Sequence, residues 1–497
     1  MPLYISKSRY CSAVQCPKML WLRNNKPEEF DQSVMNEAVL TQGNEVGDLA
    51  MGLFGHYVEV PYGKPAEMIE ATSRLMHSGE KVIAEASFAY EGQFCSVDLL
   101  LLKSDKEVEI CEVKSSTSLH DIYLHDTAFQ TYVLERLGYH VLKVCVVHIN
   151  TGYVRHGELD LQQLFTVKDV TEDVRSLQAE TASRVCFLET YLQQKEEPEQ
   201  RIGRHCTTPY ACGFWNYCTR FLPRPNVFDL ASVQTGTKFK NYDNGIITFT
   251  DIEKLGKLNA GAMMQVRHEL HDIPAEIDRP KIRAFLDSLT FPLFFLDFES
   301  FQSAVPPYDD THPYQQIVFQ YSLHYLESPD SELKHTEYLA YPGQDPRRSL
   351  AEQLCRDIPA DVCVLAYNMT FEKGRIKELA ELYPDLAGHL MSVHDNIRDL
   401  MVPFREKQYY NRRMQGSYSI KYVLPALFPD DPALDYHNLE GVHNGSEASD
   451  TFRRMAGMEP EELEEWRARL LRYCGLDTFA MVRVWQKLCE AVRNEPE

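Results

Sequence analysis

Two hydrophobic patterns recur along the chain and predict a protein of mixed α and β structure. Short apolar runs bounded by polar turns, such as 97–102 and 108–113, are typical of strands buried in a sheet. Longer stretches in which apolar residues return every three or four positions, such as 66–76 and 470–488, are typical of helices with one buried face. Because both patterns recur from the first domain to the last, we expect an α/β fold.

The first two of these runs are separated by the polar turn 103–107 and predict a β-hairpin. Asp98 lies at the start of the first strand, and Glu112 and Lys114 lie at the end of the second. Because side chains alternate along a strand, Glu112 and Lys114 share one face. Carboxylates suit Mg²⁺, and a lysine can orient water or stabilise charge on a phosphate. An ordinary surface ion pair on an exposed hairpin is the other interpretation.

This D…ExK arrangement resembles the PD-(D/E)XK core of the RecB nuclease family. Gln130 and Tyr132, on a predicted helix that leads into the next strand, are similar to the glutamine-bearing helix that faces the site in that family. The resemblance implies a restriction-endonuclease-like domain in which Asp98 and Glu112 hold Mg²⁺ or Mn²⁺. It assigns five residues to catalysis: Asp98, Glu112, Lys114, Gln130 and Tyr132.

A second group of acidic residues follows the apolar strand 293–296. Asp297 and Glu299 are two residues apart and share a strand face. Two carboxylates at the end of a buried strand are costly unless a cation neutralises them. Near the end of the chain, Tyr473 and Asp477 are four apart on a predicted helix and share a face of it.

These residues, in this order, resemble the three motifs of the DEDD exonucleases, which have an RNase H-like fold. Asp297 and Glu299 resemble the first motif, D-x-E, and Tyr473 and Asp477 resemble the third, Y-x-x-x-D. The second motif, N-x-x-F-D, is matched except that Glu372 replaces the aspartate and is one methylene longer. The resemblance implies that Asp297, Glu299 and Asp477 hold metal, and that Glu372 and Tyr473 join them in catalysis.

Three closely spaced cysteines, Cys206, Cys212 and Cys218, lie among aromatic and turn-forming residues and predict ligands of a metal ion or cluster. A fourth ligand is needed, for which Cys16 is the first candidate and Cys11 the second. One cysteine before the nuclease core and three after it resembles the iron–sulfur nucleases, which include the AddB nuclease domain and the CRISPR-associated RecB-like exonucleases. That resemblance implies a [4Fe–4S] cluster on Cys16, Cys206, Cys212 and Cys218. A four-cysteine Zn²⁺ site is the alternative.

The length of 497 residues fits two to four domains. We expect a RecB-like nuclease domain with the four-cysteine cluster over 1–222, a linker and helical insert over 223–287, and a DEDD-type exonuclease domain over 288–497. No apolar run approaches a membrane span and the N-terminus lacks a signal core, so we expect a cytoplasmic protein without membrane contact. A net charge of −22 limits DNA contact to local basic patches.

We therefore expect a metal-dependent nuclease with two sites that hydrolyses phosphodiester bonds of DNA, single-stranded or at duplex ends. An RNA-processing exonuclease is one alternative, because DEDD folds also act on RNA. A nucleic-acid-binding or scaffold protein with an inert site is another. Two departures favour it: Glu372 in the second motif, and the absence after Gly43 of the histidine that RecB-like nucleases often carry. The oligomeric state stays open.

Overall fold

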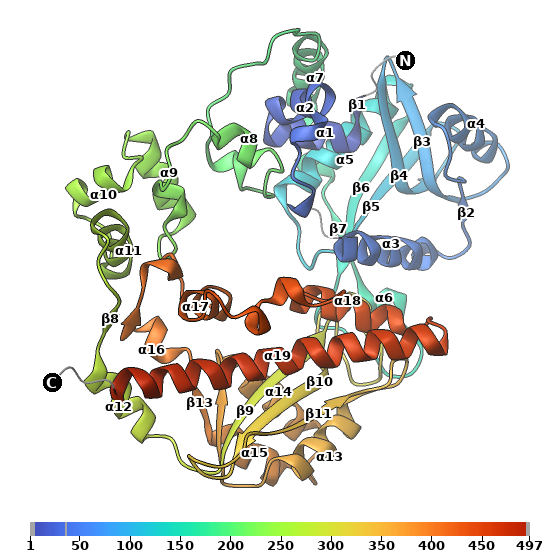
Figure 1. Cartoon of the computed structure of the whole chain (residues 1–497). Helices are drawn as coiled ribbons and strands as arrows, with labels where there is room; N and C mark the ends of the chain where they lie inside the picture. The colour runs from blue at the N-terminus through green and yellow to red at the C-terminus, as the bar shows by residue number, and fades with distance from the viewer. Residues whose placement is uncertain (1–4, 35–36, 494–497) are drawn as a thin grey trace. The chain divides into compact units, whose positions relative to one another are not determined.

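The computed structural model describes residues 5–34 and 37–493, with the side chains of residues 37–40 excepted. The chain divides into two compact units (Figure 1). Unit 1 comprises residues 1–221 and 303–315, and unit 2 comprises residues 222–302 and 316–497. Within the described ranges, no helix combines the length and apolar character needed to cross a membrane.

Unit 1 is a mixed sheet with helices on both faces. Its strands are β1 (Ile5–Ser6), β2 (Val58–Glu59), β3 (Val82–Tyr90), β4 (Gln93–Leu102), β5 (Glu107–Lys114), β6 (His140–Ile149) and β7 (Phe165–Asp169). Its helices are α1 (Lys7–Gln15), α2 (Pro17–Asn25), α3 (Glu37–Met51), α4 (Pro65–Met76), α5 (Asp121–Arg136), α6 (Leu161–Leu164), α7 (Thr171–Tyr191) and α8 (Trp215–Thr219). The sheet is seven-stranded, in the order β2-β3-β4-β5-β6-β7 with β1 beside β4.

Alternation along the strands builds two apolar layers, one on each face of this sheet. Ile110 and Val144 point into the layer formed with α1, α5 and α7, whereas their neighbours Cys111 and Cys145 point into the opposite layer. Burial on both faces explains why these strands read as continuous apolar runs. The predicted hairpin is confirmed as the antiparallel pair β4–β5. Glu112 and Lys114 have the same parity as Ile110 on β5, and Asp98 has the same parity as Leu100 on β4, so the three residues lie on the α5 side of the sheet.

Unit 2 contains the second sheet and the longest helix of the chain. Its strands are β8 (Glu276–Ile277), β9 (Leu293–Phe301), β10 (Ile317–Leu326), β11 (Lys334–Leu339), β12 (Cys363–Ala366), β13 (Ile397–Asp399) and β14 (Tyr409–Tyr410). Its helices are α9 (Thr235–Asp243), α10 (Phe249–Leu255), α11 (Ala260–His271), α12 (Arg279–Asp287), α13 (Arg347–Asp357), α14 (Thr370–Leu382), α15 (Ala387–Asp395), α16 (Val402–Arg405), α17 (Ile420–Leu427), α18 (Gly445–Met455) and α19 (Pro460–Arg493).

The main sheet of unit 2 has the order β11-β10-β9-β12-β13. Strands β9, β12 and β13 are parallel to one another, and β10 runs antiparallel to both of its neighbours, β9 and β11. Phe294 and Leu296 of β9 pack against α13, α14 and α15, whereas Leu293 and Phe295 face α19, which lies across the other side of the sheet (Figure 1). The predicted strand 293–296 continues to Phe301, so Asp297 and Glu299 lie within β9, on the α19 side.

The observed division of the chain differs from the expected one in two places. The helices of the predicted insert, α9 to α11, cluster with unit 2, and the segment 303–315, predicted to belong to the last domain, clusters with unit 1. Ala304, Val305 and Tyr314 of this segment join the apolar layer that contains α3. Hydrogen bonds from Arg155 to the carbonyls of Pro306 and Pro307, both 3.0 Å, hold it further. Such long-range packing leaves no signature in local sequence pattern.

Candidate functional site

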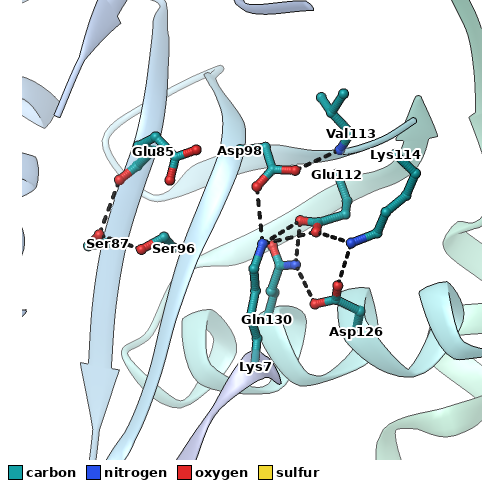
Figure 2. Close-up of polar contacts among 10 residues, drawn as sticks. All are labelled: Lys7, Glu85, Ser87, Ser96, Asp98, Glu112, Val113, Lys114, Asp126 and Gln130. Atoms are coloured by element: carbon teal, nitrogen blue, oxygen red, sulfur yellow. Dashed lines mark hydrogen bonds and ion pairs between the residues drawn. The ribbon is translucent and has the colours of Figure 1, made fainter. Parts of the chain in front are cut away.

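The first candidate site lies where β4, β5, α5 and α1 meet in unit 1 (Figure 2). Strands β4 and β5 supply the three residues of the D…ExK pattern, and the structure brings all three together with Gln130 of α5. The Oδ2 atom of Asp98 accepts a hydrogen bond from the backbone N–H of Val113 at 2.8 Å. The amide of Gln130 donates to Glu112 Oε2 at 2.7 Å.

Two residues that the sequence did not single out complete this cluster. Lys7, the first residue of α1, donates from Nζ to Asp98 Oδ1 at 3.0 Å and to the two carboxylate oxygens of Glu112 at 2.9 and 3.0 Å (Figure 2). Asp126 of α5 accepts from Lys114 Nζ at 2.8 Å, and Lys114 also contacts Glu112 Oε1 at 2.6 Å. Three carboxylates and two ammonium groups therefore share one site.

Burial and neighbouring charge shift the protonation of these groups. Burial, with the charges of Asp126 and Asp98, raises the pKa of Glu112 to about 7. Burial alone would lower the pKa of Lys114, but the Glu112 and Asp126 carboxylates raise it well above its usual value. Lys114 consequently keeps its proton near neutral pH and can act as a cation, not as a base.

Glu85 of β3 adds a further carboxylate beside Asp98 (Figure 2). Its backbone φ angle of 56° lies in the left-handed region, which residues other than glycine rarely adopt. Burial and the charge of Asp98 raise the pKa of Glu85 to about 7. Strained backbone next to perturbed carboxylates is typical of functional sites.

Tyr132, expected in catalysis, is not brought into the first cluster. It follows Gln130 by two positions on α5, which turns it to another side of the helix. There it packs against the apolar core and lies under the guanidinium of Arg136, 5.2 Å from its ring centre. The residue that shares the site face with Gln130 is Asp126, four positions earlier, and this spacing was the available sequence signal.

The second candidate site lies between β9, α14 and α19 of unit 2. Asp297, Glu299 and Cys474 offer ligand atoms that lie within 4.8 Å of one another. Asp477, one turn along α19 from Tyr473, adds a carboxylate, and its charge is the largest one acting on both Asp297 and Glu299. All the expected second-site residues on β9 and α19 therefore converge.

Glu372, in the first turn of α14, is the most deeply buried carboxylate of this second cluster. It is 2% exposed, and its Oε2 atom has no hydrogen-bond partner among the described residues. Burial raises the pKa of Glu372 to about 8, and its charge acts on Asp297 and Glu299. An unpartnered buried carboxylate oxygen is costly unless a proton or a cation satisfies it, so the donor set fits a cation site.

Two hydroxyl groups and one ammonium border the second cluster. Tyr436, in the short 3-10 helix Tyr436–Asn438 that the sequence analysis did not single out, donates from its hydroxyl to Asp477 Oδ1 at 2.6 Å. Burial raises the pKa of Asp477 to about 6, although hydrogen bonds from Tyr436 and Tyr473 lower it. The charge of Lys421 favours ionisation of Glu299 and Asp477. Tyr473 is thus placed at the carboxylates, as the Y-x-x-x-D spacing requires.

Four cysteines of unit 1 line one cavity: Cys16, Cys206, Cys212 and Cys218. Cys16 ends α1, and the other three come from the segment before and within α8. Burial raises the pKa of all four thiols. They therefore stay protonated unless a metal replaces the proton, and four thiols from distant segments fit that exchange. Cys11, the second candidate, instead lines a cavity with Lys7 and Lys114.

One family matches a stretch that lies mostly in unit 2 and also includes the unit 1 segment 303–315. Residues 294–419 match the family described as "Domain of unknown function (DUF2779)". The matched range begins within β9 and ends just before α17, so it includes Asp297, Glu299 and Glu372 but not Asp477.

Three relatives share about a quarter of their residues with this chain over the matched segments. The chain is 25% identical over 211 residues to "Uncharacterized protein UU173" of Ureaplasma parvum, covering 38% of this chain and 30% of that protein. It is 25% identical over 233 residues to "Uncharacterized protein MG366 homolog" of Mycoplasma pneumoniae, covering 43% of this chain and 35% of that protein. For "Uncharacterized protein MG366" of Mycoplasma genitalium the identity is 24% over 206 residues, 38% and 31% of the two chains. The match spans only about a third of each relative's length.

Proposed function

We propose that the protein is a metal-dependent nuclease that hydrolyses phosphodiester bonds of DNA and has one site in each unit. The observation that carries this proposal is the pair of separate carboxylate clusters, each built on the strand positions where its motif predicted it. Unit 1 would be a PD-(D/E)XK domain and unit 2 an RNase H-like domain. The mixed sheets, with α5 over the first and α19 over the second, support this.

The residues of each site would divide the work between holding cations and handling the phosphate. Asp98 and Glu112 would hold a divalent ion in unit 1, and Asp297, Glu299 and Asp477 would hold ions in unit 2. Mg²⁺ or Mn²⁺ bound there would activate water and stabilise developing charge. Lys114, held by Glu112 and Asp126, would face the phosphate as a fixed positive charge. Tyr473, within reach of Asp477, would orient the attacking water.

We further propose that Cys16, Cys206, Cys212 and Cys218 hold a [4Fe–4S] cluster, with Zn²⁺ as the alternative. The support is their convergence on one cavity from both ends of the unit 1 sequence. Such a group would tie the end of α1 to the segment around α8 and so stabilise the domain. All thirteen cysteines of the chain are free, which fits the reducing cytoplasm.

The test is digestion of DNA labelled at the 5′ or 3′ end by the full-length protein with Mg²⁺ or Mn²⁺. Lys114→Ala should abolish one activity, and Asp477→Ala should abolish the other, seen as loss of trimming from the 3′ end. Each loss should reach several orders of magnitude. Lys103→Ala on the β4–β5 turn and Glu490→Ala on α19 are controls, because both residues form surface ion pairs.

The same assay separates the alternatives. If Lys114→Ala removes every product and Asp477→Ala removes none, unit 2 is better interpreted as a substrate-binding domain. If matched RNA is cleaved and DNA is not, the RNA-processing alternative replaces ours. The absence of any metal-dependent product from DNA or RNA would refute the nuclease proposal.

A further inference from the structure

Lys7 occupies the position between the two carboxylates of the ExK hairpin. Its ammonium lies 3.0 Å from Asp98 Oδ1 and 2.9 and 3.0 Å from the two oxygens of Glu112 (Figure 2). An ammonium has three hydrogens, so these three contacts use its full donor capacity. Lys114 and Gln130 each contact only two carboxylate oxygens of the cluster, one fewer than Lys7.

A divalent ion bound by Asp98 and Glu112 would need the same space. Mg²⁺ lies about 2.1 Å from its oxygen ligands. An ion bound to these three oxygens from the same side would overlap the ammonium, which lies 2.9–3.0 Å from them. The two cations therefore compete for these three oxygens.

The charge of the cluster favours the exchange. Without Lys7, the carboxylates of Asp98, Glu112 and Asp126 and the ammonium of Lys114 carry a net charge of minus two when ionised. One divalent ion neutralises this charge, whereas the Lys7 ammonium neutralises only half of it. Lys7 therefore offsets part of the carboxylate charge in the absence of metal, and a divalent ion would complete the neutralisation.

We propose that Lys7 is a resident cation that a divalent ion must displace before the first site is complete, so that Lys7 sets the metal affinity of this site. This inference rests on the proposed function, because it takes Asp98 and Glu112 as metal ligands. The contact is internal to unit 1 and needs no other molecule.

The surroundings of Lys7 allow its side chain to leave while its helix stays in place. Its backbone is fixed at the start of α1, where the Ser6 hydroxyl accepts a hydrogen bond from the N–H of Arg9 at 3.3 Å. The side chain is 23% exposed and borders a cavity of about 420 Å³, which Lys114 and Asp126 also line. A displaced ammonium could therefore move into this cavity beside the site.

The experiment measures Mn²⁺ binding directly, by the electron paramagnetic resonance signal of free Mn²⁺. It uses the full-length protein carrying Asp297→Asn and Asp477→Asn, which disable the second cluster. Replacing Lys7 by Met removes the competing charge at nearly constant length, and we expect the Kd for Mn²⁺ to fall at least tenfold. Lys7→Arg keeps the charge and should leave the Kd within about threefold. Lys103→Met removes a lysine from the β4–β5 turn, outside the cluster, and should leave the Kd for Mn²⁺ unchanged.

Three results have distinct meanings. A tighter Kd in Lys7→Met with an unchanged Kd in Lys7→Arg supports the inference. An equal or weaker Kd in Lys7→Met, with binding lost in Glu112→Gln, overturns it and leaves the metal site intact. Binding that Glu112→Gln does not alter overturns the metal site of unit 1 and the inference together. If Lys7→Met does not fold, Lys7→Gln, which keeps a hydrogen-bond donor without charge, replaces it in every comparison.

Discussion

Glu372 offers a prediction in which stability reports on a proposed catalytic group. The carboxyl is 2% exposed and its Oε2 atom lacks a partner among the described residues. In the metal-free protein, burial raises the pKa of Glu372 from its ordinary value of 4.5 to about 8. Because the folded pKa lies above the unfolded one, ionisation favours unfolding at every pH above 4.5, and this penalty is complete only above pH 8.

The size of the effect follows from the pH interval over which the unfolded chain is ionised and the folded chain is not. At pH 7 this interval is about 2.5 pH units, and at 1.36 kcal/mol per unit it amounts to about 3 kcal/mol. At pH 5 the same reasoning leaves about 1 kcal/mol. Glu372→Gln keeps the shape and removes the ionisation. The variant should therefore stabilise metal-free unit 2 by about 3 kcal/mol at pH 7 and about 1 kcal/mol at pH 5.

The assay is urea unfolding in the presence of a chelator at pH 5 and pH 7, followed by tryptophan fluorescence. The fluorescence of Trp485 reports on unit 2, because its ring packs edge-on against Phe295 with the ring centres 5.9 Å apart. Comparison with Trp485→Phe identifies which unfolding transition belongs to unit 2. Glu381→Gln on the same helix is the control, because its side chain is 67% exposed, and it should change stability by less than about 0.5 kcal/mol. Added Mn²⁺ should stabilise the wild-type protein more than Glu372→Gln.

Two results would refute this reasoning about Glu372. One is a Glu372→Gln variant that is less stable than the wild-type protein at pH 7. The other is a stability difference that is equal at pH 5 and pH 7, because the penalty would then not come from ionisation. Glu372→Asp keeps the carboxylate and should retain second-site activity. If Glu372→Gln also retains that activity, the Glu372 carboxylate is not part of the catalytic set.

Two further predictions concern the thiol cavity and the second cluster. A Cys→Ser change at any one of the four proposed ligands, Cys16, Cys206, Cys212 and Cys218, should remove the bound iron or zinc in elemental analysis and lower the stability of unit 1. Visible absorbance should also be lost if the group is an iron–sulfur cluster. Metal retained at full stoichiometry would contradict this ligand set. Tyr436→Phe removes a hydrogen bond that lowers the pKa of Asp477, so the acid limb of the second activity should move to higher pH; a limb that stays in place would show that Asp477 does not set it.

Local sequence pattern was sufficient to predict which motif carboxylates lie close together in both sites. Asp98 and Glu112 could be placed together because a hairpin brings neighbouring strands into register. Asp297 and Glu299 could be placed on one face because side chains alternate along a strand, and the observed strand continues to Phe301 and includes both residues. In each case a short-range rule of geometry fixes the relation between the residues.

The missed residues are those whose positions depend on packing between distant segments. Lys7 reaches Glu112 across 105 positions of the chain, and Tyr436 reaches Asp477 across 41. Neither relation has a spacing rule, because it depends on how α1 and the 3-10 helix of Tyr436 pack onto other elements. Asp126 is a different case, because its distance of four residues from Gln130 on α5 was visible in the sequence. The expectation for Tyr132 came from resemblance to a motif, and the periodicity of the helix turns that residue elsewhere.

The segment 303–315 has a consequence for how the protein is made. Unit 1 has most of its residues by position 221, but Ala304, Val305 and Tyr314 complete its α3-side core. During synthesis, the ribosome must add 94 further residues after residue 221, from 222 to 315, before that core can close. At ordinary elongation rates this takes roughly 5 to 20 s. During this time, part of the apolar interior of the nascent first unit stays exposed. Chaperones that bind exposed apolar surface near the ribosome can bind it in this state.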